Sequence, residues 1–299
     1  MSEPERFPFV QLEFAGALGL DQGRYLAREP ERVLVVAVAD APPAPRRRLR
    51  RPRPQDIDPD APPRALPLTT ITVVRPEPLG DQVDAERWFA GVRDDTDELE
   101  AELEAALKVL NRALHAHRTA ALDPAVPDAS PEHALAVRLG YGTGEGLSRG
   151  RWEEAVALPA SARRGRGEAL RPQERVAAVL GRREEVPPHE VLLLRARADL
   201  DAGRNREAAL QLRVGLEGLL ADLEGGSPKH VEEVAALRER RSGTGQAAND
   251  ALRGELTEQR KAELAETLRL CERLLRRRRV SGNPTGAPLG FDASAEGPG

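Results

Sequence analysis

The sequence predicts an α+β protein, in which a mostly antiparallel or mixed sheet with one or two helices precedes an all-α domain of helical hairpins. Two observations predict this class. Short segments rich in Val, Ile, Leu and Phe are separated by turn residues in the first part of the chain, as strands are. Farther along, apolar residues recur every three or four positions between Gly, Pro and Asn, as in helices. We expect an α+β domain at 1–160, a helical domain at 168–280 and a disordered tail at 281–299.

Five segments of the first domain have the composition of strands. The run ERVLVVAVAD is almost wholly apolar and therefore suits a strand buried inside the sheet. LTTITVVRP is rich in β-branched residues and is stopped by Pro76. A helical turn in SPEHA is expected before the last strand. The expected strands are FPFVQLEF at 7–14, GRYLAR at 23–28, ERVLVVAVAD at 31–40, LTTITVVRP at 68–76 and HALAVRLGYG at 133–142.

The composition changes between the third and fourth expected strands, at residues 41–67. Proline recurs through this segment, and almost none of its side chains are apolar. Such a segment cannot offset the entropy cost of ordering, so we expect a disordered, solvated loop.

Helical spacing begins near residue 81. The stretch DAERWFAGV at 84–92 predicts a short helix, and residues 94–122 predict a long one. Acidic residues in the first turns of the long helix complement the positive end of its dipole. Leucines at spacings of four, four, three and four line one face of it. They are Leu99, Leu103, Leu107, Leu110 and Leu114.

The second domain carries regular helix start and stop residues. Asn205 and Ser227 are expected as N-caps. The last helix ends in four arginines, which suit the negative end of its dipole. Its apolar stripe consists of Leu264, Leu268, Cys271 and Leu275. The helices are expected at 171–180, 188–203, 205–225, 227–240 and 246–279, after a linker at 161–167.

Composition limits the classes of function. Aromatic residues make up 3% of the chain, whereas ligand pockets are usually lined with them. The net charge of −4 gives no global preference for nucleic acid or for an anionic membrane. Only Lys108, Lys229 and Lys261 among the 45 basic residues are lysines, a skew typical of a GC-rich genome. A cluster of arginines therefore carries less functional information here than it would elsewhere.

The sequence also bears on location. The longest purely aliphatic run, Val33 to Ala39, is far shorter than the ~20 residues that cross a bilayer. The N-terminus lacks the basic start and apolar stretch of a secretory signal. One cysteine, Cys271, cannot form an internal disulfide. We expect a cytoplasmic protein that does not associate with a membrane.

The stretch RLGYGTGEGLSRGRW, residues 138–152, has alternating glycines like those of a phosphate-binding loop. A dinucleotide fingerprint would need a third glycine at position 145, which is Glu145, and a P-loop would need a nearby lysine. Glu145 would also repel a phosphate. We therefore expect a turn after a strand, with small-ligand binding as an alternative. The residues of this alternative site are Gly140, Gly142, Gly144, Arg151 and Trp152.

An arginine run lies within the expected loop at 41–67. Such an arm could bind RNA or DNA, because each contact to a phosphate releases counterions. Aromatic residues that would stack on bases are absent from it. A solvated loop, or a loop near the acidic start of the helix at 94–104, are the other interpretations. The run comprises Arg46, Arg47, Arg48, Arg50, Arg51 and Arg53.

The titratable residues do not predict a metal centre or a catalytic pair. His115 and His117 diverge by about 200° on a helix, so they cannot readily chelate one ion. Cys271 lies on an apolar stripe, where a buried, inert thiol is expected. The remaining histidines are isolated and expected in solvent; they are His133, His189 and His230. We expect no cofactor, no metal and no catalytic residue.

Residues 191–220, VLLLRARADLDAGRNREAALQLRVGLEGLL, resemble a single tetratricopeptide-type hairpin. A tight AGRN turn joins two helices, and small residues at Ala196, Ala208 and Ala209 allow close packing. The segment lacks the aromatic positions and the closing proline of that family. Such repeats need about three copies to bury a continuous core. One copy favours a hairpin within a small bundle.

The chain as a whole resembles a protein family from high-GC actinobacteria. The segments that carry the resemblance are FPFVQLEF, LNRALHAHR, VRLGYGTGEG with the following GRW, LRARADLDAGRNREAALQLRVGLE and LCERLLRRRRV. No function is assigned to that family, so the resemblance implies no activity, ligand or catalytic residue.

These observations predict a non-catalytic protein-interaction or scaffolding protein whose C-terminal helices contact another protein. The first alternative is polyanion binding through the Arg46–Arg53 run. The second is small-ligand binding at the Gly140–Trp152 turn.

Overall fold

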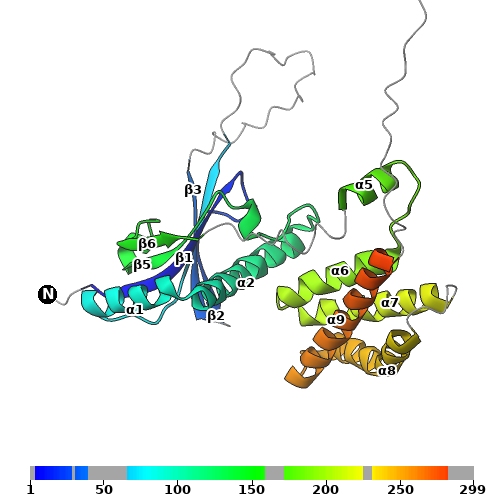
Figure 1. Ribbon diagram of the computed structural model, residues 1–299. Helices are drawn as coiled ribbons and strands as arrows, with labels where there is room; N and C mark the ends of the chain where they lie inside the picture. Colours follow the sequence, from blue (N-terminus) through cyan, green and yellow to red (C-terminus); the bar gives the residue numbers. More distant parts are fainter. Residues whose placement is uncertain (1–3, 29–30, 40–65, 159–171, 225–230, 282–299) are drawn as a thin grey trace, which may run out of the picture. The chain divides into compact units, whose positions relative to one another are not determined.

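The computed structural model describes residues 4–28, 31–39, 66–158, 172–224 and 231–281. The chain divides into two compact units, Met1–Ser161 and Ala162–Gly299, and each contains its own buried apolar core. The first unit is an antiparallel sheet with helices, and the second is helical (Figure 1). This arrangement confirms the predicted α+β class.

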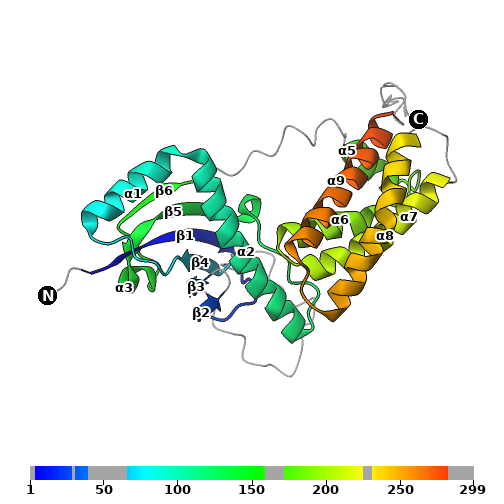
Figure 2. The same cartoon turned by 90° about the horizontal axis from the view of Figure 1, so that it is seen from below.

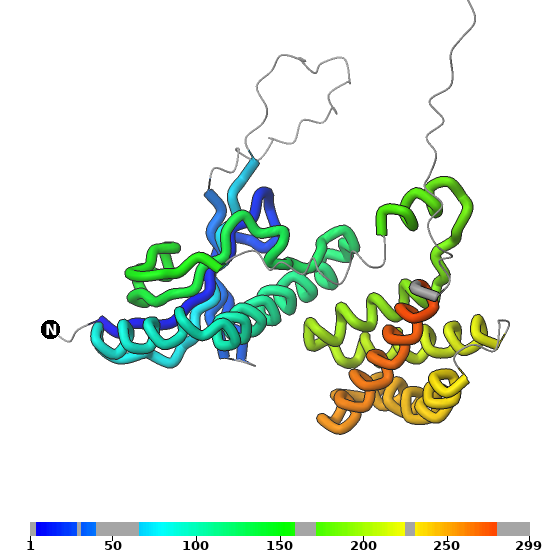
Figure 3. Tube along the Cα trace, in the orientation of Figure 1, coloured from blue at the N-terminus to red at the C-terminus, as the bar shows by residue number. Residues whose placement is uncertain are grey.

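The sheet of the first unit has six strands in the described residues, in the order β2-β3-β4-β1-β5-β6. Every neighbouring pair is antiparallel, which excludes the mixed alternative. Figure 3 shows how β1, at the start of the chain, lies between strands that come much later. The strands are β1 (Arg6–Ala15), β2 (Gly23–Arg28), β3 (Glu31–Ala39), β4 (Leu68–Val74), β5 (Ala136–Thr143) and β6 (Glu154–Ala157).

Five of these strands match the predicted ones, and β6 was not predicted. β6 has four residues, two of them alanine, and none of its side chains is buried. Its sequence therefore carries no alternation of apolar and polar residues that would indicate a strand. This segment is a strand because it pairs with β5.

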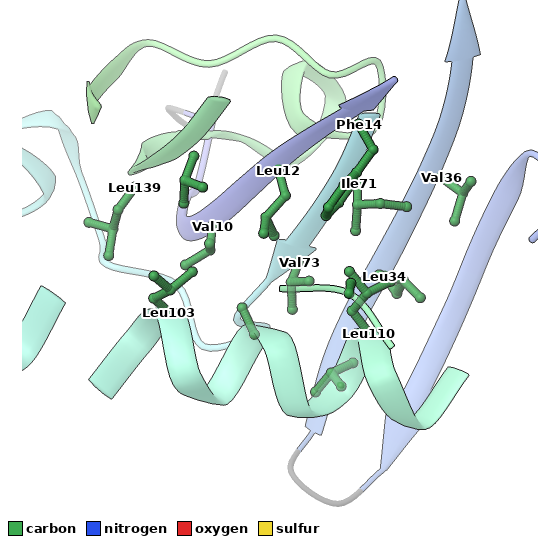
Figure 4. Packing of buried hydrophobic residues seen from close by; sticks show 14 of the residues in the cluster. Val10, Leu12, Phe14, Leu34, Val36, Ile71, Val73, Leu103, Leu110 and Leu139 are labelled. Carbon is green, nitrogen blue, oxygen red and sulfur yellow. The ribbon is translucent and has the colours of Figure 1, made fainter. Parts of the chain in front are cut away.

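Two helices cover one face of the sheet (Figure 2): α1 (Gln82–Asp94) and α2 (Thr96–Ala121). Asp95 separates them, because its carboxylate accepts hydrogen bonds from the N–H groups of Asp97 and Glu98. Leu103 and Leu110 of α2 point toward the sheet in Figure 4, where they meet the apolar side chains of the strands. These side chains include Val10, Leu12, Phe14, Leu34, Val36, Ile71, Val73 and Leu139.

The opposite face of the sheet is more polar. Side chains alternate along β1, so Phe9, Gln11 and Glu13 lie on the face away from α1 and α2. We call it the back face. A 3-10 turn at Pro131–His133 precedes β5, as predicted, and a one-turn helix, α3 (Gly144–Leu147), follows it.

The second unit consists, in its described part, of five helices. α6 and α7 form the predicted hairpin, and Gly203 between them has a φ of +75°, which a side chain would strain. A Cβ on Gly215 would lie 3.0 Å from the side chain of Leu193, so glycine allows α6 and α7 to approach closely. The helices are α5 (Pro172–Leu180), α6 (Pro188–Asp201), α7 (Asn205–Glu224), α8 (Val231–Arg253) and α9 (Glu258–Ser281).

The prediction of a single helix at 246–279 is wrong, because residues 254–257 are not helical and separate α8 from α9. α8 instead continues through the stretch SGTGQAAND, although Gly243 and Gly245 disfavour a helix. Thr244, Ala247 and Ala251 are buried against the core there, and this burial outweighs the low propensity.

The predicted caps differ in outcome. Asn205 is the first residue of α7, and its side chain donates to the carbonyl of Gly203 instead of capping the helix. Several predictions fall outside the described residues: the loop at 41–67 except Leu66 and Pro67, the linker at 161–167, Ser227, and the tail at 281–299 except Ser281.

Candidate functional site

The glycine-rich stretch at 138–152 runs along β5, turns through α3 and returns toward β6. Thr143 caps α3, because its hydroxyl accepts a hydrogen bond from the N–H of Gly146 at 3.1 Å. Gly150 has a φ of +72°, in the left-handed region that favours glycine. The predicted strand followed by a turn is therefore the structure of this stretch.

Close packing requires one of the glycines and favours glycine at a second position. A Cβ on Gly140 would lie 2.0 Å from the carbonyl oxygen of Glu154 and 2.8 Å from the Cβ of Ala155, both in β6. A Cβ on Gly142 would lie 3.1 Å from the Cα of Trp152. Glycine at these positions lets the returning chain lie directly on the back face of the sheet.

The returning chain brings apolar side chains onto the back face. Leu147 is buried there with Phe9 and Val74. The Trp152 ring lies 6.1 Å from the Phe9 ring and stays 38% exposed. The guanidinium of Arg138 lies 5.2 Å from the centre of the Trp152 ring, a cation–π distance.

A polar cluster lies beside these apolar residues and consists of Gln11, Glu13, Thr72 and Arg138. Arg138 donates to the Glu13 carboxylate at 2.6 Å. The buried amide of Gln11 donates to the Thr72 hydroxyl at 3.0 Å and to the carbonyl of Gly150 at 3.4 Å. The bond from Gln11 to Gly150 ties the returning chain to the sheet, and the bonds together engage each of the four side chains with protein atoms.

Sequence reasoning missed this cluster, although a pattern indicated it. Gln11 and Glu13 alternate with apolar residues in FPFVQLEF, and Thr70 and Thr72 do so in LTTITVV. Alternation in two strands that pair predicts a shared polar face. Predicting the cluster would have required the pairing of β1 with β4, which the sequence does not reveal.

The predicted ligand turn is therefore partly assembled. Gly140, Gly142 and Trp152 lie together on the back face, whereas Gly144 begins α3 and Arg151 is exposed on the return. Ligand binding by these residues stays a prediction. The six arginines Arg46, Arg47, Arg48, Arg50, Arg51 and Arg53 lie outside the described residues, so polyanion binding stays a prediction as well.

The cysteine and the histidines that the sequence analysis considered differ in their burial. Burial, and secondarily Glu272, raise the pKa of the Cys271 thiol to about 12. In the described ranges, no group of three or more His, Cys, Asp or Glu side chains is arranged to hold a metal ion. The prediction that His189 is solvated is wrong, because it is buried where Gly218 of α7 meets α6. His133 is exposed, and His230 lies outside the described residues.

The four arginines that end α9 are ion-paired. Arg276 pairs within its own helix, with Glu272 at 3.7 Å. The next three reach three different helices: Arg277 pairs with Glu233 of α8, Arg278 with Asp222 of α7 and Arg279 with Glu190 of α6. Besides complementing the helix dipole, the run joins the end of α9 to the rest of the bundle.

A crevice of about 240 Å³ lies between α8 and α9. Its two arginines are engaged by neighbouring acids, Arg240 by both oxygens of Glu266 and Arg260 by Glu263. The crevice therefore presents paired charges.

The helical unit exposes an apolar stripe on α7, which we call the outer stripe and define as Leu210, Val214 and Ala221. Their spacings of four and seven place them on one helix face. Leu210 is 37% exposed and Val214 57% exposed. The face that α7 buries holds Leu212, Leu216, Leu219 and Leu220.

Among the described residues, no helix combines the length and the apolar composition that a bilayer-spanning segment needs. Comparison of the chain with protein-family models, with curated proteins and with solved structures gave no match.

Proposed function

We propose that the chain is a non-catalytic protein-interaction or scaffolding protein whose C-terminal helices contact another protein. The outer stripe of α7 supports this proposal. Leu210 and Val214 are large aliphatic side chains on successive turns, and they lose contact with water when a partner helix packs on them. The actinobacterial family resemblance adds no competing activity.

The test is recovery of partners by the tagged full chain from its native host. We expect a co-purified protein whose recovery falls at least tenfold when Leu210→Glu and Val214→Glu are combined. The matched control combines Val83→Glu and Leu122→Glu, which place the same charges on exposed apolar residues of the first unit. The control is expected to retain the partner.

The recovered protein is then purified and titrated against the chain and both variants. Equal affinity for the stripe variant and the wild type would contradict the proposal. So would the absence of any partner that the wild type retains and the stripe variant loses.

A further inference from the structure

The edge strand β2 places three exposed side chains in a row on the back face. Arg24, Leu26 and Arg28 pair with Val35, Val33 and Glu31 of β3, respectively. Residues directly opposite one another share a face of the sheet. Val33 and Val35 in turn lie opposite Val74 and Thr72 of β4, which are back-face residues. The row therefore lies on the side of the sheet away from α1 and α2.

The main chain of β2 has one edge without a strand. All six residues of β2 pair with β3, and β2 is the last strand in the sheet order. Figure 2 shows β2 at that end of the sheet, with no described strand of the first unit beyond it. Alternate N–H and C=O groups of an edge strand point outward, and they can pair with an added strand.

The two arginines of the row form no ion pair within the described part of the chain, although Glu31 lies opposite Arg28 on the same face. Neither Arg24 nor Arg28 forms an ion pair or a side-chain hydrogen bond with a described residue, in contrast to the arginines that end α9. Leu26, between them, is 60% exposed. Arg24 and Arg28 are four positions apart along the strand, which places their Cα atoms about 13 Å from each other.

Arginines on an edge strand can also serve only to prevent aggregation. That role accounts for Arg24 and Arg28 but not for the residues between them. A purely protective edge avoids exposed apolar side chains at its centre, where β2 has Tyr25 and Leu26. An apolar residue bracketed by two cations is complementary to an apolar residue bracketed by two acids.

We propose that β2 is a docking edge, which takes an extended segment of a partner protein as an added strand. The segment has an acidic, an apolar and an acidic residue at alternate positions. Its main chain pairs with β2, its apolar side chain packs on Leu26, and its acids pair with Arg24 and Arg28. This surface is separate from the outer stripe of α7, so the failure of either proposal leaves the other unaffected.

The test uses the full chain and a capped, fluorescently labelled peptide, Thr-Glu-Thr-Ile-Thr-Glu-Thr. Fluorescence anisotropy measures affinity, and hydrogen exchange measures protection of the amides at 23–28. We expect saturable binding that slows exchange in this segment. Combining Arg24→Glu and Arg28→Glu is expected to weaken binding by tenfold or more, because both ion pairs become repulsive.

The matched control combines Arg182→Glu and Arg183→Glu, which make the same change in net charge at exposed positions of the second unit. Its affinity for the peptide is expected to equal that of the wild type. Two control peptides carry Lys in place of Glu, or N-methyl groups on alternate amides that block strand pairing. Both are expected to bind at least tenfold more weakly.

Several results would overturn the proposal. These are the absence of peptide binding, equal binding of the N-methylated peptide, and unchanged affinity of the Arg24 and Arg28 variant. An oligouridylate that binds through these arginines, while the peptide does not bind, would instead make the edge a polyanion site.

Discussion

Gly140 belongs to a run of glycines that resembles a phosphate-binding motif, but packing explains why this position is glycine. The position that a Cβ would occupy is taken by the backbone of β6, so the glycine lets two strands approach. The same residue type has no such neighbour at Gly243 in α8, where nothing lies within 4 Å of an added Cβ. Opposite effects of the same substitution are therefore expected at the two positions.

Gly140→Ala should lower the free energy of unfolding by about 2 kcal/mol, because the added methyl forces β6 away from β5. Gly243→Ala should raise it by about 0.5–1 kcal/mol, because alanine favours the helix and meets no neighbour. Urea unfolding of both variants measures these differences. A loss of stability at Gly243 equal to that at Gly140 would contradict this account.

Tyr141 makes the stability of the fold depend on pH in the alkaline range. Burial, and then its hydrogen bond to Glu154, raise the pKa of the Tyr141 hydroxyl from 10.0 to about 12. Folding therefore favours the protonated form. Its stabilising contribution is complete below pH 10 and is lost as the pH rises from 10 to 12.

We expect wild-type stability to fall more steeply between pH 10 and 12 than that of Tyr141→Phe, by about 2 kcal/mol over the range. Denaturant unfolding of both proteins at several pH values isolates this contribution, since other groups titrate equally in both. Parallel curves would show that Tyr141 titrates alike in the folded and unfolded chain.

At the scale of elements, ion pairs join the helices of the second unit. Glu190 is the most enclosed of the acids that receive the arginines ending α9, with a side chain 11% exposed. It accepts from Arg279 at 2.6 Å and from Arg175 of α5 at 2.9 Å. One carboxylate therefore holds three helices at one point.

Glu190→Gln should cost about 2 kcal/mol of stability, because it leaves two guanidinium groups facing each other around a neutral side chain. Glu224→Gln is the matched control. Its pair with Arg238 is more than half exposed on both sides, and an exposed pair contributes less than about 1 kcal/mol. Thermal unfolding distinguishes the two, and equal costs would mean that enclosure of Glu190 has no energetic effect.

At the scale of the whole molecule, the two units carry different spectroscopic probes. Both tryptophans, Trp88 and Trp152, belong to the first unit, whereas the second unit contributes helix and no tryptophan. Each unit buries its own apolar cluster, so each can unfold at its own midpoint.

We therefore expect the unfolding midpoints by tryptophan fluorescence and by far-ultraviolet circular dichroism to differ in the same urea titration. Gly140→Ala serves as the check, because it should shift the fluorescence midpoint more than the circular dichroism midpoint. Coincident transitions in the wild type and in this variant would indicate one cooperative unit.

Local patterns were sufficient for most elements. Strand and helix periods lie in neighbouring residues, so five strands, both helices over the sheet and the α6–α7 hairpin could be predicted. The strand β6 could not, because it depends on pairing with β5. The break before α9 was missed although local residues mark it: Gly254 follows α8, and the hydroxyl of Thr257 accepts a hydrogen bond from the N–H of Arg260 in the first turn of α9. The burial of His189 was missed because it depends on Gly218 in another helix.

The sequence by itself determined the α+β class, the helix faces and the turn after β5, because hydrophobic period and glycine conformation act within a few residues. Only the tertiary structure decided what those residues meet. It paired β1 with β4 and β5, which brought Gln11, Thr72 and Arg138 together, and it left Arg24, Leu26 and Arg28 at the edge. Strand order is fixed by the burial of whole faces, which no local stretch of sequence encodes.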